Sequence, residues 1–356
     1  MNQNWIDFLK QQGAGEDGLD FGNVPEELLS AQSATILAPL TDIGVIRATG
    51  EDATVFLNNL LTNDVKGLSA DGVQRNGLCT PKGRLLATFL IWHEGANLMM
   101  ALSADLHMPI LKKLSQYVLR SKVNLSDASN ERVLIGLSGP QASRALAALG
   151  PVPTELFIAA NIGQGRIIRL DGQRYLLVVD AGAAPGVWRQ LATLARPAGL
   201  AAWRWLEIVA GVPIISMATQ DEFIPQMVNF ESIGGISFKK GCYPGQEIVA
   251  RTQYLGKIKR RMYRAHLESA TPVAGSHLYA PETGDQSCGR VVSTAPSPLG
   301  GSEVLAVIQS TCADAGLVHL DSPSGPRLLF RSLPYDSVVV QEQPGQSPEA
   351  PAFPQL

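Results

Sequence analysis

The sequence predicts an α+β fold made of two successive α+β units with antiparallel sheets, followed by a small C-terminal β-barrel. Apolar strands separated by short turns recur in both halves of the chain. From about residue 258, helical periodicity gives way to short strands between Pro- and Gly-rich turns. The chain has 356 residues, 45% of them hydrophobic, which is enough for two or three packed domains.

The first unit is expected over residues 36–130, after an N-terminal helix and loop over 1–35. The segment TDIGVIRATG predicts a strand, and EDATVFLNNLLTNDV predicts a helix. Turns at Pro81-Lys82-Gly83 and Glu94-Gly95 divide the next segment into three strands of an antiparallel meander. ADLHMPILKKLSQYVLR then predicts a helix that is disturbed near Pro109. The apolar residues at helical spacing in the first of these helices are Phe56, Leu57, Leu60 and Leu61.

The second unit is expected over residues 131–257 and repeats this organisation. ERVLIGLSG predicts a strand, and PQASRALAALG predicts the helix that follows it. Asp171-Gly172 joins GRIIRL to QRYLLVVD, which is a strong hairpin signal. PGVWRQLATLARPAG and AAWRWLEIVAG predict helices. The barrel is expected over 258–336, and a disordered Pro-rich tail over 337–356.

Several classes of protein receive no support from the sequence. It contains no GxGxxG or phosphate-loop pattern, and its longest apolar runs are too short for a membrane span. The N-terminus lacks the features of a secretory signal, so a cytoplasmic location is expected. The five histidines show no metal-ligand spacing, and no metal site is predicted. No disulfide is expected, and three of the four cysteines, Cys79, Cys288 and Cys312, are assigned structural roles.

The fourth cysteine, Cys242, lies in the stretch FKKGCYPGQEIVAR. Positive charge from Lys239 and Lys240 would favour the thiolate, the form that attacks electrophiles or binds metal. Pro244 and the glycines on either side of it predict a sharp turn that presents neighbouring side chains. The alternative stays open that Cys242 is a small buried apolar residue and that EIVAR is an ordinary strand.

Positive charge is concentrated in residues 239–264. This segment holds eight basic residues and one acid, Glu247, a net charge of +7 in a chain whose net charge is −3. Such a surface would attract an anionic partner, namely a polyglutamylated cofactor, a phosphate-bearing ligand or RNA. The alternative stays open that it is a solvated face that binds nothing, which is the commoner role of such a charge run. The candidate partner surface consists of Lys239, Arg251, Lys257, Lys259, Arg260 and Arg261.

The segment KGCYPGQE at 240–247 resembles the signature of the YgfZ family of folate-binding proteins, which is related to the glycine-cleavage T-protein. FIPQMVNFESIGGISF before it and IVARTQYLGKIKRR after it extend the resemblance. Weaker similarity includes LLTNDV, CTPKGRLLATF, QYVLRSKVNLSD and GPQASRALAAL. The resemblance implies a T-protein-like fold, in which α+β domains and a C-terminal β-barrel enclose a central folate-binding channel.

The same resemblance implies a function. It points to a folate-binding accessory factor for the synthesis or repair of iron–sulfur enzymes, including those that modify tRNA, with tetrahydrofolate as ligand and these enzymes as partners. Cys242 would be a nucleophile, a redox group or a transient iron ligand. The other signature residues, expected near the cofactor, are Lys240, Gly241, Tyr243, Gly245, Gln246 and Glu247. Asn63, Gln226 and Asn229 are further polar candidates for folate contact, although such residues more often satisfy loops.

Two positions depart from the T-protein pattern. The aspartate that T-proteins carry in the strand TPKGRLLATFLIW corresponds here to Ala87, followed by Thr88. The glutamate before an Ala-Gly pair corresponds to Val209, with Glu207 two residues earlier and on another helix face. These departures argue against aminomethyl transfer by the T-protein mechanism. A folate-dependent one-carbon transferase remains an alternative, as does an adaptor that docks a tRNA-modifying enzyme or RNA.

Overall fold

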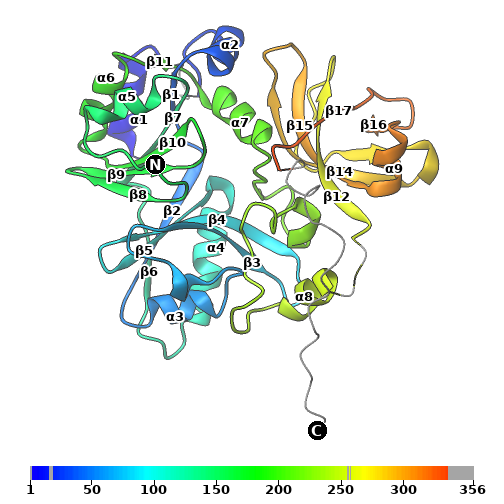
Figure 1. Cartoon of the computed structure of the whole chain (residues 1–356), viewed down its shortest axis with the longest axis horizontal. Helices are drawn as coiled ribbons and strands as arrows, with labels where there is room; N and C mark the ends of the chain where they lie inside the picture. Colours follow the sequence, from blue (N-terminus) through cyan, green and yellow to red (C-terminus); the bar gives the residue numbers. More distant parts are fainter. Residues whose placement is uncertain (1, 16–18, 255, 257, 336–356) are drawn as a thin grey trace.

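Strand pairing divides the chain among three sheets, which surround helix α7 (Figure 1). The computed structural model describes residues 2–15, 19–254, 256 and 258–335. The predicted α+β class is confirmed, because helices alternate with strands that pair antiparallel, apart from a short parallel contact between β1 and β11. The Pro-rich tail expected over 337–356 lies outside the described residues.

The first sheet contains the predicted meander and has the strand order β3-β4-β5-β2-β6. The turn between β3 and β4 is closed by a hydrogen bond from Thr80 N to Arg84 O of 2.8 Å, and Gly83 has a φ of +74° that favours glycine. The Glu94-Gly95 turn joins β4 to β5. The strands are β2 (Ile43–Thr49), β3 (Val73–Cys79), β4 (Leu85–Glu94), β5 (Asn97–Ser103) and β6 (Asn124–Asp127).

The second sheet has the order β11-β1-β7-β10-β9-β8. Its hairpin at Asp171-Gly172 is confirmed: the Asp171 carboxylate accepts hydrogen bonds from the backbone N–H groups of Gln173 and Arg174, as turn-forming aspartates do. Strand β1 pairs with β7, although its residues fall in the first predicted unit; the domain boundaries themselves stay predictions. The strands are β1 (Ile36–Pro39), β7 (Arg132–Ser138), β8 (Ala159–Ile162), β9 (Gly165–Arg169), β10 (Arg174–Asp180) and β11 (Arg196–Pro197).

The third sheet is the curled C-terminal sheet, ordered β16-β13-β14-β15-β12-β17 (Figure 1). Strand β15 is buried on both faces. Val304, Ala306 and Ile308 pack inside the sheet, whereas Leu305 and Val307 pack in the core shared with the rest of the chain. The strands are β12 (Arg260–Leu267), β13 (His277–Tyr279), β14 (Ser287–Pro296), β15 (Ser302–Gln309), β16 (His319–Leu320) and β17 (Leu329–Arg331).

Helices cover the sheets and join them. The N-terminal helix α1 belongs to the core of the second sheet, where Trp5 packs edge-on against Trp188. Helix α4 runs through Pro109. The α-helices are α1 (Gln3–Gln11), α2 (Val24–Ser33), α3 (Ala53–Asn58), α4 (Ala104–Tyr117), α5 (Ala142–Ala147), α6 (Ala184–Leu191), α7 (Leu200–Val209), α8 (Gln246–Tyr254) and α9 (Ser310–Ala315). Short 3-10 helices are η1 (Val65–Gly67), η2 (Pro225–Val228) and η3 (Pro281–Thr283).

Two local predictions are wrong. The helix expected to continue through Leu61 ends at Asn58, because the Asn58 side chain instead accepts a hydrogen bond from Val65 N and the chain turns away. The alternative that EIVAR is a strand is also wrong, because these residues form the first half of α8. Val249 is the residue of that helix whose side chain is fully buried.

Helix α7 holds the three sheets together. Trp205 and Ile208 pack in the same core as Val292 and Leu305 of the third sheet. Trp203, on another face of the helix, packs with Leu176 of the second sheet. Since the apolar residues of α7 point in several directions, the helix is buried between layers and does not lie on one surface.

The contact between Trp203 and Gly136 of β7 gives a test of this packing. A Cβ atom at Gly136 would lie 2.5 Å from the Trp203 ring. We expect Gly136→Ala to lower the free energy of unfolding by about 1–3 kcal/mol, because the added methyl group would overlap the Trp203 ring and displace it from its packed position. Urea unfolding measures the change, and Gly182→Ala is the control, since nothing lies within 4 Å of a Cβ there. Equal stability of the two variants would contradict the packing described.

Candidate functional site

The side chain of Lys240 anchors the loop 240–247 to the end of α3 and the segment that follows it. Its ammonium donates hydrogen bonds to the backbone oxygens of Asn58, Leu61 (2.5 Å) and Asn63 (3.0 Å). Burial lowers the pKa of Lys240 to about 8, with a smaller contribution from Lys66. The group is therefore still largely protonated at neutral pH and has three N–H donors for its three acceptors.

Tyr243 and Gly245 anchor the middle of this loop. Tyr243 is buried, its ring centre lies 5.3 Å from the Lys240 ammonium, and burial raises the pKa of its hydroxyl. Gly245 has a φ of +80°, and a Cβ there would lie 2.4 Å from the oxygen of Thr80. The loop therefore packs directly on the turn between β3 and β4, at a position that favours glycine.

The end of the loop continues into α8, which is also anchored. Gln226 is fully buried, and its amide donates a hydrogen bond of 2.7 Å to Val249 O. The Gln246 amide donates to Lys240 O at 3.5 Å, which connects the two ends of the signature. Glu247 is exposed in the first turn of α8, where a carboxylate is favourable for the helix dipole.

Cys242 lies exposed between these anchored residues, whereas Cys79, Cys288 and Cys312 are buried. The alternative of a buried apolar Cys242 is therefore wrong. The Lys240 ammonium is directed to the carbonyl groups of Asn58, Leu61 and Asn63, and the effect of the two lysines on the Cys242 thiolate stays a prediction. Burial raises the pKa of Cys79 and of Cys288 to about 12, so these thiols are inert near neutral pH.

The residues of the predicted basic surface differ in exposure and in pairing. Lys239, Arg251 and Lys259 are exposed, whereas Arg260 is half-buried and Lys257 lies outside the described residues. Arg261 forms an ion pair with Glu231 and also donates a hydrogen bond to Gln226 O. This pairing reduces the positive charge that the linear sequence indicates, and the assignment of the surface to a partner stays a prediction.

The three polar residues suggested for folate contact have structural partners. The Asn63 amide donates to Arg75 O (3.0 Å) and Gly234 O (2.7 Å). The Asn229 amide donates to Met262 O at 2.8 Å, and Gln226 bonds to Val249 O. None of the three is among the described residues that line the cavities below. Their contact with folate stays a prediction.

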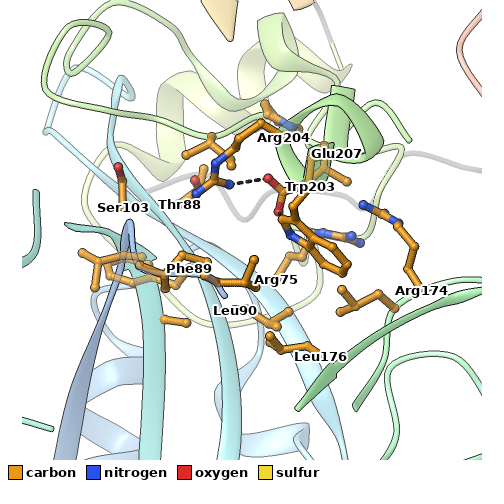
Figure 2. Close-up of a pocket in the computed structure, with 18 of the residues that line it drawn as sticks. Arg75, Thr88, Phe89, Leu90, Ser103, Arg174, Leu176, Trp203, Arg204 and Glu207 are labelled. Atoms are coloured by element: carbon orange, nitrogen blue, oxygen red, sulfur yellow. Dashed lines mark hydrogen bonds and ion pairs between the residues drawn. The ribbon is translucent and has the colours of Figure 1, made fainter. Parts of the chain in front are cut away.

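Two adjoining cavities lie near the centre of the molecule. The inner one, about 100 Å³, is formed largely by β4, β5, β10 and α7 (Figure 2), and the outer one, about 830 Å³, lies between α2, α7 and the segment 232–233. Both are lined by Arg75, Leu170, Arg174 and Val212, so these residues mark their junction. The combined volume of the two cavities is of the order typical of ligand pockets, whose walls are mainly apolar.

Aromatic side chains and one carboxylate line the inner cavity. Trp203 and Glu207, one helical turn apart on α7, both line it, and the Trp203 indole N–H donates to Glu207 at 3.2 Å (Figure 2). Glu207 also pairs with Arg204, whose guanidinium in turn binds Asp42 at 2.7 Å. Val209 lines the outer cavity, so positions 207 and 209 face different cavities, as expected for residues two apart on a helix.

Strand alternation explains the position of the other T-protein departure. Ala87 is completely buried in the main core, whereas its neighbour Thr88 lines the inner cavity and accepts a hydrogen bond from Ile215 N at 3.3 Å. Glu207 is the carboxylate residue among the described residues that line this cavity. Because Glu207 is paired with Arg204, the inner cavity offers no unpaired carboxylate from the residues described.

The loop and the cavities share supporting segments. Lys240 binds Asn63 O, and the Asn63 side chain bonds to the backbone of both Arg75 and Gly234. Thr62 adds a parallel connection, since its hydroxyl donates to Gly235 O at 2.7 Å and accepts from Gly77 N at 2.8 Å. Hydrogen bonds from Lys240 to Asn63 and from Asn63 to Arg75 thus connect the loop that carries Cys242 with the cavity wall.

Sequence reasoning missed Arg75, Arg174 and Trp203 as site residues. The signal available was weak: Arg174 precedes an apolar run in QRYLLVVD, whereas Arg75 lies between two other polar residues in VQRNGLC. Clusters of three or more metal-binding side chains are absent from the described residues, and no helix in that part of the chain is long and apolar enough to cross a membrane.

Comparison with known proteins is consistent with this architecture. The model of the GCVT N-terminal domain family matches residues 13–158. A tRNA-modifying protein YgfZ of Colwellia psychrerythraea is 30% identical over 86% of this chain and 94% of its own length, and one of Yersinia pestis is 32% identical over 84% and 92%. One of Vibrio vulnificus is 39% identical over 63% of this chain and 68% of its own length.

Among solved structures, the glycine cleavage system aminomethyltransferase T of Bartonella henselae aligns with a TM-score of 0.73 and 18% identity. The alignment covers 92% of this chain and 96% of that protein. The predicted T-protein-like fold is therefore confirmed. At this identity the likeness concerns the fold alone.

The packing of Gly245 generates a prediction. We expect Gly245→Ala to separate the loop 240–247 from the β3–β4 turn, because the new methyl group would overlap Thr80 O and Gly83 Cα (2.6 Å). Hydrogen exchange of residues 80–84 and 240–249 should become faster than in the wild type. Gly241→Ala is the matched control, since it lies in the same loop with nothing within 4 Å. Unchanged exchange in Gly245→Ala would refute the contact.

The anchoring role of Lys240 generates a second prediction. Lys240→Met should lower the free energy of unfolding by about 2–3 kcal/mol, because it removes charge-assisted hydrogen bonds and leaves buried carbonyl groups without donors. The control is Lys239→Met, which removes the neighbouring exposed lysine and should leave the free energy of unfolding nearly unchanged. Denaturant unfolding of both variants provides the measurement, and equal stabilities would show that Lys240 is no anchor.

Proposed function

Because this chain belongs to the YgfZ family of tRNA-modifying proteins, we propose that it binds tetrahydrofolate in its central cavities and supports the synthesis or repair of iron–sulfur enzymes through Cys242. Enzymes that modify tRNA are among the proposed clients. The observation that carries the proposal is the position of Cys242, an exposed thiol in a loop whose neighbouring residues are anchored.

The anchoring suits a thiol that meets large partners. Lys240, Tyr243 and Gly245 fix the loop from below, so the Cys242 side chain is held at the surface without needing to fold on contact. A thiolate is a soft ligand with high affinity for iron and iron–sulfur clusters. Cys242 would act as a transient ligand to a client's iron, losing its proton to solvent as the sulfur–iron bond forms.

The cavities fit a folate in size and chemistry. Trp203, Phe89 and Leu176 would hold the flat pterin between apolar walls, and the Glu207 carboxylate would accept hydrogen bonds from its N–H groups. The bound tetrahydrofolate supplies a reduced pterin that can carry one-carbon groups. The contribution of the chain is to bind and orient this group and to keep water away from it.

The alternative functions have less support. One-carbon transfer by the T-protein route would need a carboxylate near the substrate, whereas Ala87 is buried in the core and Glu207 is paired with Arg204. An adaptor that binds RNA would use the exposed Lys239, Arg251 and Lys259. These three cations form a modest surface, since Arg261 is paired with Glu231.

Substitution of Cys242 tests the proposal. In cells that lack the chromosomal copy, Cys242→Ala should fail to restore the product nucleoside of an iron–sulfur tRNA-modifying enzyme, measured by mass spectrometry of tRNA hydrolysates. The purified variant should bind tetrahydrofolate within about twofold of the wild type, because the thiol lies outside the cavities. Normal levels of the nucleoside with Cys242→Ala would disprove the role of the thiol. Absence of folate binding to the wild type would disprove the role of the cavities.

A further inference from the structure

Two arginines meet at the junction of the central cavities. Arg75, from β3, and Arg174, from β10, line both cavities, and both appear near Trp203 in Figure 2. Arg174 is 4% exposed. Buried arginines normally have a full set of hydrogen-bond acceptors, because an unpaired N–H group away from water is unfavourable.

The hydrogen bonds of Arg174 are incomplete. Its guanidinium has five N–H donors, and its Nε binds the Asp171 carboxylate at 2.5 Å. Nη1 is buried and has no hydrogen-bond partner. The face of the guanidinium lies 5.8 Å from the centre of the Trp203 ring. The side chain is therefore held in place on one side and lacks an acceptor on another.

Arg75 increases the local positive charge. One of its N–H groups donates to Ile233 O at 3.4 Å, and its guanidinium lies 4.4 Å from the centre of the Phe157 ring. Burial, followed by the nearby charge of Arg174, lowers the pKa of Arg75 to about 10, so it stays charged at neutral pH. Neither contact neutralises this charge, since a carbonyl group and an aromatic ring are both uncharged.

The nearby carboxylates already bind other side chains. Asp171 binds Arg174, and Glu207 is bound by Arg204 and Trp203. A water molecule could accept a hydrogen bond from Nη1, but it would leave the repulsion between the guanidinium groups unchanged. An anionic group would satisfy the donor and reduce the repulsion at once.

We propose that Arg75 and Arg174 form an anion subsite that binds the carboxylates of the glutamate tail of a folate. The pterin and the benzoyl amide of folate are uncharged at neutral pH, so the glutamate is its anionic part. Guanidinium groups bind carboxylates through paired, charge-assisted hydrogen bonds. This inference rests on the proposed function, and it names the residues that would recognise the tail.

Calorimetric titration of the full chain with two ligands tests the subsite. One ligand is 5-formyltetrahydrofolate, and the other is its uncharged analogue in which methylamine replaces the glutamate. We expect the wild type to bind the folate more tightly than the analogue. Arg174→Gln and Arg75→Gln should each weaken folate binding by about 10- to 100-fold and leave the affinity for the analogue unchanged.

Matched variants keep this test interpretable. Arg196→Gln removes an exposed arginine that lies outside both cavities, and it should bind both ligands as the wild type does. Arg174→Lys keeps the charge but loses the planar fork, so it should restore part of the folate affinity. Thermal unfolding checks each variant, and Arg75→Gln carries the test if Arg174→Gln does not fold.

The outcomes separate the two proposals. If the wild type binds the folate and its analogue equally well, or if the arginine variants weaken both ligands equally, the anion subsite is wrong while folate binding stands. If the wild type binds neither ligand, both the subsite and the folate-binding part of the proposed function are wrong. Loss of folate affinity alone in both glutamine variants supports the subsite.

Discussion

The contact between the Lys240 ammonium and three backbone carbonyl groups is the constraint on which the site depends. It joins a loop near residue 240 to the segment 58–63, almost 180 positions earlier in the chain. Within this segment Thr62 pairs with the backbone of Gly77 and Ser237, whereas the carbonyl groups of Asn58, Leu61 and Asn63 accept hydrogen bonds from the Lys240 ammonium. The lysine supplies these donors, and the same contact fixes Cys242 at the surface next to the first sheet. One half-buried cation thus joins the loop to the segment that follows α3.

Helix α7 positions the walls of the cavities. Residues four apart, Trp203 and Glu207, face the inner cavity, whereas Trp205 and Ile208 face the core shared with the third sheet. Leu206 and Val209 of the same helix line the outer cavity. One helix therefore packs the three sheets together and contributes to the walls of both cavities, so cavity shape depends on the packing between sheets.

Much of the fold could be predicted because it follows from local chemistry. The turn at Gly83 and the hairpin at Asp171 depend on residues within four positions, and the meander and the C-terminal strands follow from turns that separate apolar segments. The end of α3 and the helical state of EIVAR could not be predicted, because they depend on packing between distant segments. The charge of residues 239–264 was overestimated for the same reason: Glu231 and Glu303, which pair with Arg261 and Arg264, lie outside that segment. The exposed thiol was predictable from the loop, whereas Arg75 and Arg174 become neighbours only when β3 and β10 face each other across a cavity.

The two parts of the site, an exposed thiol and an internal cavity, are physically connected although they do not touch. Arg75 belongs to the cavity wall, and its backbone oxygen accepts a hydrogen bond from Asn63, whose own backbone oxygen is bound by Lys240. Arg75 also bonds to Ile233, next to Gly234, the second acceptor for Asn63. A ligand that moves the Arg75 side chain would change its hydrogen bond to Ile233 O, whereas the bond from Asn63 is to the Arg75 backbone. Coupling between cavity and loop requires that a ligand favour one arrangement of this network over another, and the size of that preference limits the effect on Cys242.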